Sequence, residues 1–120
     1  MENKKLLIVE DEPVVALSLE RLLGNAGYMT ESVDCGEKAL ERVHQNRPDA
    51  ILMDIKLKGD WDGIETAEKI LAFCVIPIIY LTAYTDSKLK GRMRESGVFS
   101  FLEKPFEEDV LLETLWNTLK

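Results

Sequence analysis

The chain has 120 residues, of which 46% are hydrophobic and 31% are charged, and this is the size and balance of one compact domain over residues 1–120. Its formal net charge of −7 argues against a general binder of nucleic acid or of anionic membranes, since either function needs a basic surface facing phosphates. Cys35 and Cys74 form no CxxC pair, no signal-peptide leader follows Met1, and no apolar stretch reaches the roughly 18 residues that a spanning helix needs. We therefore expect a cytoplasmic protein without a disulfide framework, a zinc site or a membrane-inserted segment.

Five short apolar runs divide the chain. They occupy residues 6–9, 29–33, 50–53, 76–81 and 98–102. They recur at intervals of about two dozen residues, which is the combined length of a strand, a loop and a helix. We therefore predict a strand at each run and a helix in each stretch that follows.

The first three intervening stretches each carry an apolar face at helical spacing. The first of them has Pro13 near its start and Gly27 at its end, as helices often do. In chain order, the faces consist of Val15, Leu19, Leu22 and Ala26; of Ala39, Leu40 and Val43; and of Ile64, Ala67, Ile70 and Leu71. Such faces predict amphipathic helices that pack on a sheet.

The fourth stretch, at residues 86–97, predicts the weakest helix. Leu89 and Met93 are its apolar anchors, and Gly91 inside it costs about 1 kcal/mol relative to alanine. It also carries a local excess of positive charge from Lys88, Lys90, Arg92 and Arg94. We expect this helix to be the least firmly docked, to be the mobile element of the domain, and to form part of a partner surface.

The last stretch, at residues 107–120, predicts a helix with an acidic start and a wide apolar face. Glu107, Glu108 and Asp109 lie at the positive end of the helix dipole. The apolar side chains cover an arc of roughly 140°, and they are Leu111, Leu112, Leu115, Trp116 and Leu119. Trp116 lies at one margin of this arc, on the same side as the basic fourth helix.

Alternating strands and helices predict an α/β fold with a doubly wound parallel sheet. Unbroken apolar strands such as "AILM" are typical of strands that helices cover on both faces, with right-handed crossovers. In such a sheet the carboxyl ends of the strands share one edge, and ligands bind where the strand order reverses.

Polar residues follow four of the five predicted strands at that edge. They are Glu10, Asp11 and Glu12 after the first strand, Asp54 after the third, Thr82 after the fourth and Lys104 after the fifth. If the first and third strands are neighbours, Asp11 and Asp54 meet, and carboxylates this close repel one another unless a cation or a proton joins them. Mg²⁺ is the natural partner, because it prefers oxygen ligands and is commonly held by one or two carboxylates.

This set of residues favours phosphoryl transfer to Asp54. A carboxylate can attack phosphorus as a nucleophile and form an acyl phosphate. Mg²⁺ and Lys104 would neutralise the phosphoryl oxygens, the hydroxyl of Thr82 would hold another oxygen, and the small Ala83 would let a backbone N–H approach.

Each of these residues also has a plainer interpretation. Asp11 could cap a helix that starts near Pro13, Asp54 could be a polar strand end, and Lys104 could be a solvated turn residue. Phe101 could belong to the core. His44, the only histidine, is expected on the surface of the second helix rather than in a site. The joint spacing of Asp11, Asp54, Thr82 and Lys104 favours the functional interpretation.

The motifs "LLIVEDEP", "PDAILMDIKLKGDWDGIE", "PIIYLTAY" and "FLEKPF" occur in this order along the chain. Together they resemble the receiver domains of two-component response regulators over essentially the whole length. The resemblance implies the flavodoxin-like fold, a five-stranded parallel sheet in the order 2-1-3-4-5 with five helices.

The resemblance also implies a role for each site residue. Asp54 corresponds to the phosphoacceptor and Thr82 to the switch hydroxyl. The metal ligands would be Asp11 directly, Glu10 through water, Asp54, and the backbone carbonyl of Lys56. Lys104 would pair with the phosphoryl group, with a cis bond to Pro105, and Phe101 takes the place of the switch aromatic residue.

Several positions depart from the family pattern or vary within it. Glu10 stands where many receivers have Asp, and Phe101 lacks the hydroxyl of the commoner Tyr. Lys58 replaces a frequent Pro in the loop after Asp54. Lys56 and Tyr84 lie where side chains tune the lifetime of the phosphoryl group in this family.

The implied partners are a sensor histidine kinase or phosphotransfer protein as donor and a downstream protein or output domain. A small phosphodonor could replace the kinase. Phosphorylation would switch the surface of the fourth helix, fifth strand and fifth helix, which is also a candidate homodimer surface. Such a domain catalyses its own phosphorylation and slow dephosphorylation, but it turns over no external metabolite and is not expected to bind nucleic acid or insert into membranes.

Three other classes fit the sequence less well. A metal-dependent phosphohydrolase would usually have a second acid two residues after the nucleophile, where this chain has Lys56. A flavin-binding electron carrier would want a Ser/Thr/Gly-rich phosphate loop where this chain has "EDEP". A structural domain that is never phosphorylated is opposed by the complete set of acids, hydroxyl and lysine.

Overall fold

Strands and helices alternate along the chain. The computed structural model describes residues 3–83, 87–95 and 100–120, except for the side chains of Ser87 and Leu89. In this part of the chain the elements are β1 (Lys5–Val9), α1 (Pro13–Asn25), β2 (Met29–Val33), α2 (Gly36–Gln45), β3 (Ala50–Asp54), α3 (Gly63–Leu71), β4 (Ile78–Thr82), α4 (Ser87–Glu95), β5 (Ser100–Glu103) and α5 (Glu108–Leu119). The predicted alternation is thereby confirmed.

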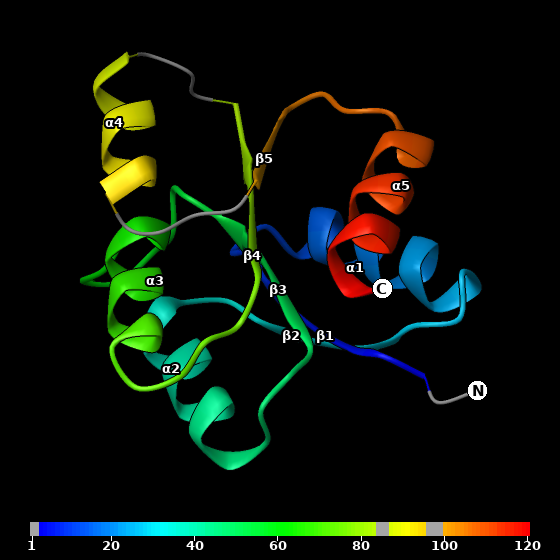
Figure 1. The fold of residues 1–120 in the computed structure, drawn as a ribbon, viewed down its shortest axis with the longest axis horizontal. Helices are drawn as coiled ribbons and strands as arrows, with labels where there is room; N and C mark the ends of the chain where they lie inside the picture. Colours follow the sequence, from blue (N-terminus) through cyan, green and yellow to red (C-terminus); the bar gives the residue numbers. More distant parts are fainter. Residues whose placement is uncertain (1–2, 84–86, 96–99) are drawn as a thin grey trace.

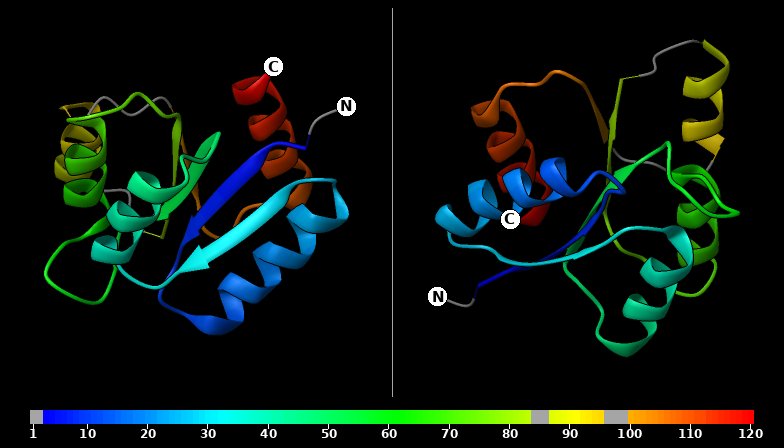
Figure 2. Two further views of the ribbon diagram at one scale, coloured as in Figure 1. Left: turned by 90° about the horizontal axis from the view of Figure 1, so that it is seen from below. Right: turned by 180° about the vertical axis from the view of Figure 1, so that it is seen from behind.

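The strands form one parallel sheet in the order β2-β1-β3-β4-β5. Helices α1 and α5 lie on one face of this sheet, and α2, α3 and α4 lie on the other (Figure 1; Figure 2). The doubly wound α/β fold with this strand order, expected from the sequence, is confirmed. The strand order reverses between β1 and β3, so the residues that follow these two strands lie side by side.

Two buried layers flank the sheet because side chains along each strand alternate between its faces. On the side of α2 and α3 the core includes Leu7, Val9, Ile51, Met53 and Tyr80 together with Ile64, Ala67 and Ile70. On the side of α1 and α5 it includes Leu6, Ile8, Leu52, Ile79 and Leu81 together with Leu19, Leu23, Leu111 and Leu115. Strands β1, β3 and β4 are therefore covered on both faces, as their unbroken apolar runs predict.

The predicted apolar face of the first helix is partly wrong. Leu19 is buried as expected, but Leu23 is also buried, whereas Ala26 is exposed and ends the helix as its C-cap. Leu23 lies one turn after Leu19, and the predicted Val15 and Leu22 also pack against this core, so the buried face is the predicted one widened by Leu23. Residues 98 and 99, at the start of the predicted fifth strand, lie outside the described residues.

Helices α5 and α4 differ in which of their apolar side chains are buried. In α5, Leu111 and Leu115 are buried, while the marginal Trp116 is 65% exposed. In α4, Met93 is buried and Leu89 falls outside the described side chains. Among the described residues, no helix combines the length and the apolar character needed to cross a membrane.

Candidate functional site

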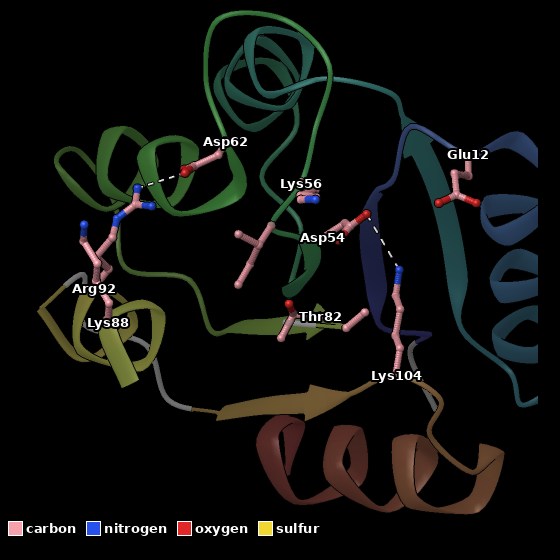
Figure 3. Close-up of a pocket in the computed structure, with 10 residues that line it drawn as sticks. Glu12, Asp54, Lys56, Asp62, Thr82, Lys88, Arg92 and Lys104 are labelled. Atoms are coloured by element: carbon pink, nitrogen blue, oxygen red, sulfur yellow. Dashed lines mark hydrogen bonds and ion pairs between the residues drawn. The ribbon is translucent and has the colours of Figure 1, made fainter. Parts of the chain in front are cut away.

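The polar residues predicted to follow the strands lie together at the carboxyl edge of the sheet. A cavity of about 420 Å³ opens there, next to Asp54 (Figure 3). Its lining consists of Glu12, Asp54, Ile55, Lys56, Asp62, Thr82, Ala83, Lys88, Arg92 and Lys104. Glu10 and Asp11 border a second cavity, between α1 and α2, so the acidic residues lie between the two hollows.

Three carboxylates form a tight cluster at this edge. Oxygen atoms of Glu10, Asp11 and Asp54 all lie within 4.8 Å of one another. Glu10 is only 3% exposed and Asp54 only 8%, so water screens their charges poorly. The cluster arises because β1 and β3 are adjacent, with Val9 paired to Met53 immediately before the acids.

Lys104 provides a positive charge beside two of these acids. Its Nζ atom lies 3.2 Å from Oε2 of Glu10 and 3.7 Å from Oδ2 of Asp54. Its backbone N–H donates to the carbonyl of Thr82 at 2.8 Å, which holds the end of β5 against the end of β4. The Lys104–Pro105 peptide bond is cis.

Burial shifts the protonation of the cluster. Desolvation, and next the charge of Asp54, raise the pKa of Glu10 from 4.5 to about 7, although Lys104 opposes this shift. Desolvation likewise raises the pKa of Asp54 above its ordinary value, again against the effect of Lys104. One lysine therefore leaves the cluster short of positive charge.

A hard divalent cation fits this donor set. Mg²⁺ takes oxygen ligands and is commonly held by carboxylates together with water and phosphate. The cluster offers three converging carboxylates, and Lys56, whose carbonyl was expected to be a ligand, lines the adjoining cavity. A dication would supply the charge that Lys104 alone does not.

The raised pKa of Glu10 predicts that the metal-free protein loses stability as the pH rises. Between the ordinary pKa of 4.5 and the folded value of about 7, the folded state binds more protons than the unfolded state. The free energy of unfolding should therefore fall by up to about 3 kcal/mol across this range and change little above it. Urea unfolding at pH 5 and pH 8 with a chelator measures the difference.

A matched pair of variants isolates Glu10 in that experiment. Glu10→Gln should reduce the slope of the pH profile, because the amide does not titrate. Glu12→Gln, on an exposed neighbour, should leave the profile unchanged. An equal slope in wild type and Glu10→Gln would show that Glu10 does not hold the extra proton.

Thr82 and Phe101 occupy opposite environments on neighbouring strands. Thr82 is buried, 2% exposed, where β4 meets the cavity. Phe101 is 38% exposed, and Nζ of Lys90 in α4 lies 5.9 Å from the centre of its ring. The interpretation of Phe101 as a core residue is therefore wrong, because its ring lies at the surface beside α4.

The loop at residues 55–62, between β3 and α3, is tied to the start of α2. Nζ of Lys58 lies 2.7 Å from Oδ2 of Asp34, and the hydrogen bond from Lys58 lowers the pKa of that carboxyl to about 2. The backbone N–H of Asp60 donates to Glu37 at 3.4 Å. Lys58, at the position of the family's frequent proline, thus anchors the loop by charge.

Tyr84, which with Lys56 was expected to tune the lifetime of the phosphoryl group, lies outside the described residues.

Gly63 is a site residue that sequence reasoning missed. Its N–H donates to the carbonyl of Ile55 at 2.7 Å, and a Cβ atom at this position would lie 2.1 Å from the carbonyl oxygen of Asp54. Only glycine lets the first turn of α3 approach the backbone of Asp54 so closely. The Asp-Gly pair before an amphipathic stretch was the available signal.

Asp11 is not a helix cap, and His44 lies on the surface. Helix α1 begins at Pro13 with Glu12 as its N-cap, so Asp11 does not cap it. His44 is exposed on α2, where its ring stacks on Phe73 with the ring centres 4.1 Å apart, and it belongs to neither cavity described above.

Comparison with known proteins points to one family. The sequence profile described as "Response regulator receiver domain" matches residues 6–116. The transcriptional regulatory protein PdtaR of Mycobacterium tuberculosis (strain CDC 1551 / Oshkosh) is 33% identical over 114 residues, covering 93% of this chain and 55% of PdtaR. The chain therefore spans about half the length of that relative.

Two further relatives match over nearly their whole length. Sporulation initiation phosphotransferase F of Bacillus subtilis (strain 168) is 32% identical over 116 residues, covering 96% of this chain and 93% of the relative. The crystal structure of the receiver domain of a sensor histidine kinase from Pseudomonas aeruginosa PAO1 is 31% identical, has a TM-score of 0.90 and covers 98% of both chains. That structure is described with a magnesium ion coordinated in its active site cleft.

Proposed function

Because the chain belongs to the family of response regulator receiver domains, we propose that Asp54 accepts a phosphoryl group in two-component signal transduction. The observation that carries this proposal is the position of the Asp54 carboxylate. It lies within 4.8 Å of Glu10 and Asp11, 3.7 Å from the ammonium group of Lys104, and on the wall of an open cavity. A nucleophile, a set of cation ligands and a positive charge thus meet where a phosphodonor can enter.

The reaction forms a bond between an oxygen of Asp54 and phosphorus while the bond from phosphorus to the donor breaks. The electron pair of the broken bond leaves with the donor group. Lys104 neutralises charge on the phosphoryl oxygens, and the hydroxyl of Thr82 and the backbone N–H of Ala83 hydrogen-bond to them.

Bound Mg²⁺ would supply Lewis-acid neutralisation of the same oxygens. Its ligands would be the carboxylates of Asp11 and Asp54, the backbone carbonyl of Lys56, and Glu10 through water. Ion binding would also keep Glu10 and Asp54 ionised against their raised pKa values.

The switch arises because Thr82 contacts the phosphoryl group in the phosphorylated state and has no such contact in the resting state. Thr82 moves toward a phosphoryl oxygen, and the space that it leaves admits the ring of Phe101. The exposed ring of Phe101 beside Lys90 suits the resting position in this scheme. Its burial would remove a contact between β5 and α4 and change the surface of α4, β5 and α5.

The donor is a sensor histidine kinase or a phosphotransfer protein, or a small phosphodonor in its place. The switched surface addresses a downstream protein or output domain, or a second copy of the chain. The protein works in the cytoplasm, catalyses its own phosphorylation and slow dephosphorylation, and acts on no external metabolite.

Mg²⁺-dependent modification is the test of this function. Incubation with phosphoramidate and Mg²⁺ should add the mass of one phosphoryl group, and a chelator should prevent the addition, because the carboxylates would otherwise repel the anionic donor. Intact mass spectrometry measures the product. Full modification without any divalent ion, or none in its presence, would contradict the proposal.

A further inference from the structure

An ion pair ties the weak helix α4 to the start of α3. Nη2 of Arg92 lies 2.9 Å from Oδ2 of Asp62, and both residues line the cavity next to Asp54 (Figure 3). Among the described side chains of α4, Met93 is the buried apolar anchor. Leu89 and Met93 are the only large apolar residues in the sequence of this helix, so polar contacts such as this one carry a larger share of its docking.

Asp62 uses its two carboxylate oxygens for separate tasks. Oδ1 accepts the backbone N–H of Glu65 at 2.8 Å and caps α3, while Glu65 completes a capping box by accepting the N–H of Asp62 at 3.3 Å. Oδ2 accepts the guanidinium of Arg92. The cap holds Asp62 in place whether or not Arg92 is bound.

Asp62 also adjoins the backbone of the phosphoacceptor. The next residue, Gly63, packs against the carbonyl of Asp54 and hydrogen-bonds to Ile55. The chain of contacts from α4 to Asp54 therefore runs through Arg92, Asp62 and Gly63. This route passes through neither Thr82 nor Phe101.

A phosphoryl group on Asp54 would change the balance in this cavity. It carries roughly two negative charges where the carboxylate carried one, so it adds about one negative charge to a hollow whose wall already holds the Asp62 carboxylate and the Arg92 guanidinium. A second anion competes with Asp62 for the guanidinium and weakens the pair.

We propose that the Arg92–Asp62 pair is a latch that holds α4 in its resting position and thereby opposes phosphorylation of Asp54. Arg92 and Asp62 are positioning residues, not catalytic ones. The inference rests on the proposed function, since the latch has a role only if Asp54 carries a phosphoryl group. Reciprocity of coupling then requires that opening the latch strengthens binding of a phosphoryl mimic.

Asp62→Asn opens the latch selectively. Asparagine caps helices about as well as aspartate, so the cap of α3 is kept while the charge that binds Arg92 is lost. The affinity for beryllium fluoride with saturating Mg²⁺ should rise about two- to fivefold, the range expected for a partly exposed ion pair. Isothermal titration calorimetry measures it, and amide exchange in α4 should become faster in the resting protein.

Two controls separate the latch from general effects. Asp60→Asn removes an equal charge from the same loop and should leave the affinity unchanged, because Asp60 is exposed and its hydrogen bond to Glu37 uses the backbone N–H. In an Arg92→Gln background, Asp62→Asn should add nothing, because the partner is already gone. Arg92→Lys should retain part of the wild-type behaviour.

The outcomes distinguish the latch from the proposed function. Equal gains for Asp62→Asn and Asp60→Asn, or a gain that persists in the Arg92→Gln background, would overturn the latch. So would wild-type affinity in Asp62→Asn. If the wild-type protein itself does not bind beryllium fluoride with Mg²⁺, the proposed function fails, and the latch fails with it.

Discussion

Asp54→Asn is expected to abolish the phosphoryl adduct completely. The amide cannot attack phosphorus, and the remaining acids of the cluster keep their positions because asparagine has nearly the same shape. Intact mass after incubation with phosphoramidate and Mg²⁺ gives the result. Asp109→Asn, in the exposed first turn of α5, is the matched control and should be modified like the wild type.

The same variant should also change the charge balance of the metal-free cluster. The charge of Asp54 is one cause of the raised pKa of Glu10, so its removal should lower that pKa. The fall in unfolding free energy between pH 5 and pH 8 should then be smaller than in the wild type. A persistent adduct in Asp54→Asn would instead place the acceptor elsewhere, with the neighbouring carboxylates of Glu10 and Asp11 the first to test.

The fold could be predicted from sequence because its core strands are covered on both faces. The runs that became β1, β3 and β4 are continuous and apolar, and such runs have few alternatives in a protein of this size. The edge strand β2 has Val33 as its buried residue, yet its place in the regular spacing of the five runs identified it. In α1 the prediction missed Leu23 and wrongly included Ala26, because Leu22 and Leu23 both pack on the core and the face is wider than the periodicity indicates.

Those site residues that directly follow a strand could be predicted from the sequence. Glu10, Asp11, Asp54, Thr82 and Lys104 come after apolar runs, and parallel strands bring such residues to one edge. The contacts missed from sequence join segments far apart in the chain: Lys58 with Asp34, and Arg92 with Asp62. No regular spacing in the sequence predicts either pair, because each contact depends on how the loops and helices pack around the sheet.

The position of the Phe101 side chain could not be predicted from the sequence either. Its strand was predicted, but sequence does not decide whether an aromatic residue on the edge strand β5 turns inward or outward. The structure has the ring at the surface beside Lys90 of the basic helix α4. Among the described residues, helix α4 thus makes two contacts on the side of the site: Lys90 with Phe101, and Arg92 with Asp62.

Lys104→Met is expected to slow phosphorylation of Asp54 by about a hundredfold or more at pH 7, the typical cost of losing one preorganised donor to a developing charge. Methionine keeps most of the length of the side chain but removes the ammonium group that lies 3.7 Å from Asp54. The rate of adduct formation with phosphoramidate and Mg²⁺ measures the effect. Lys38→Met, which removes an exposed lysine paired with Asp34, should react at the wild-type rate.

Two separate causes contribute to that loss, and pH distinguishes them. Lys104 lowers the pKa of both Glu10 and Asp54, so its removal lets burial raise both values further. Any protonation of Asp54 that follows at subsaturating Mg²⁺ makes the carboxylate unreactive, and raising the pH should recover this part of the rate. The part that does not recover by pH 9 measures the direct contact of the ammonium group with the phosphoryl oxygens. Full recovery at high pH would mean that Lys104 only keeps Asp54 ionised, whereas a wild-type rate at pH 7 would remove Lys104 from the mechanism altogether.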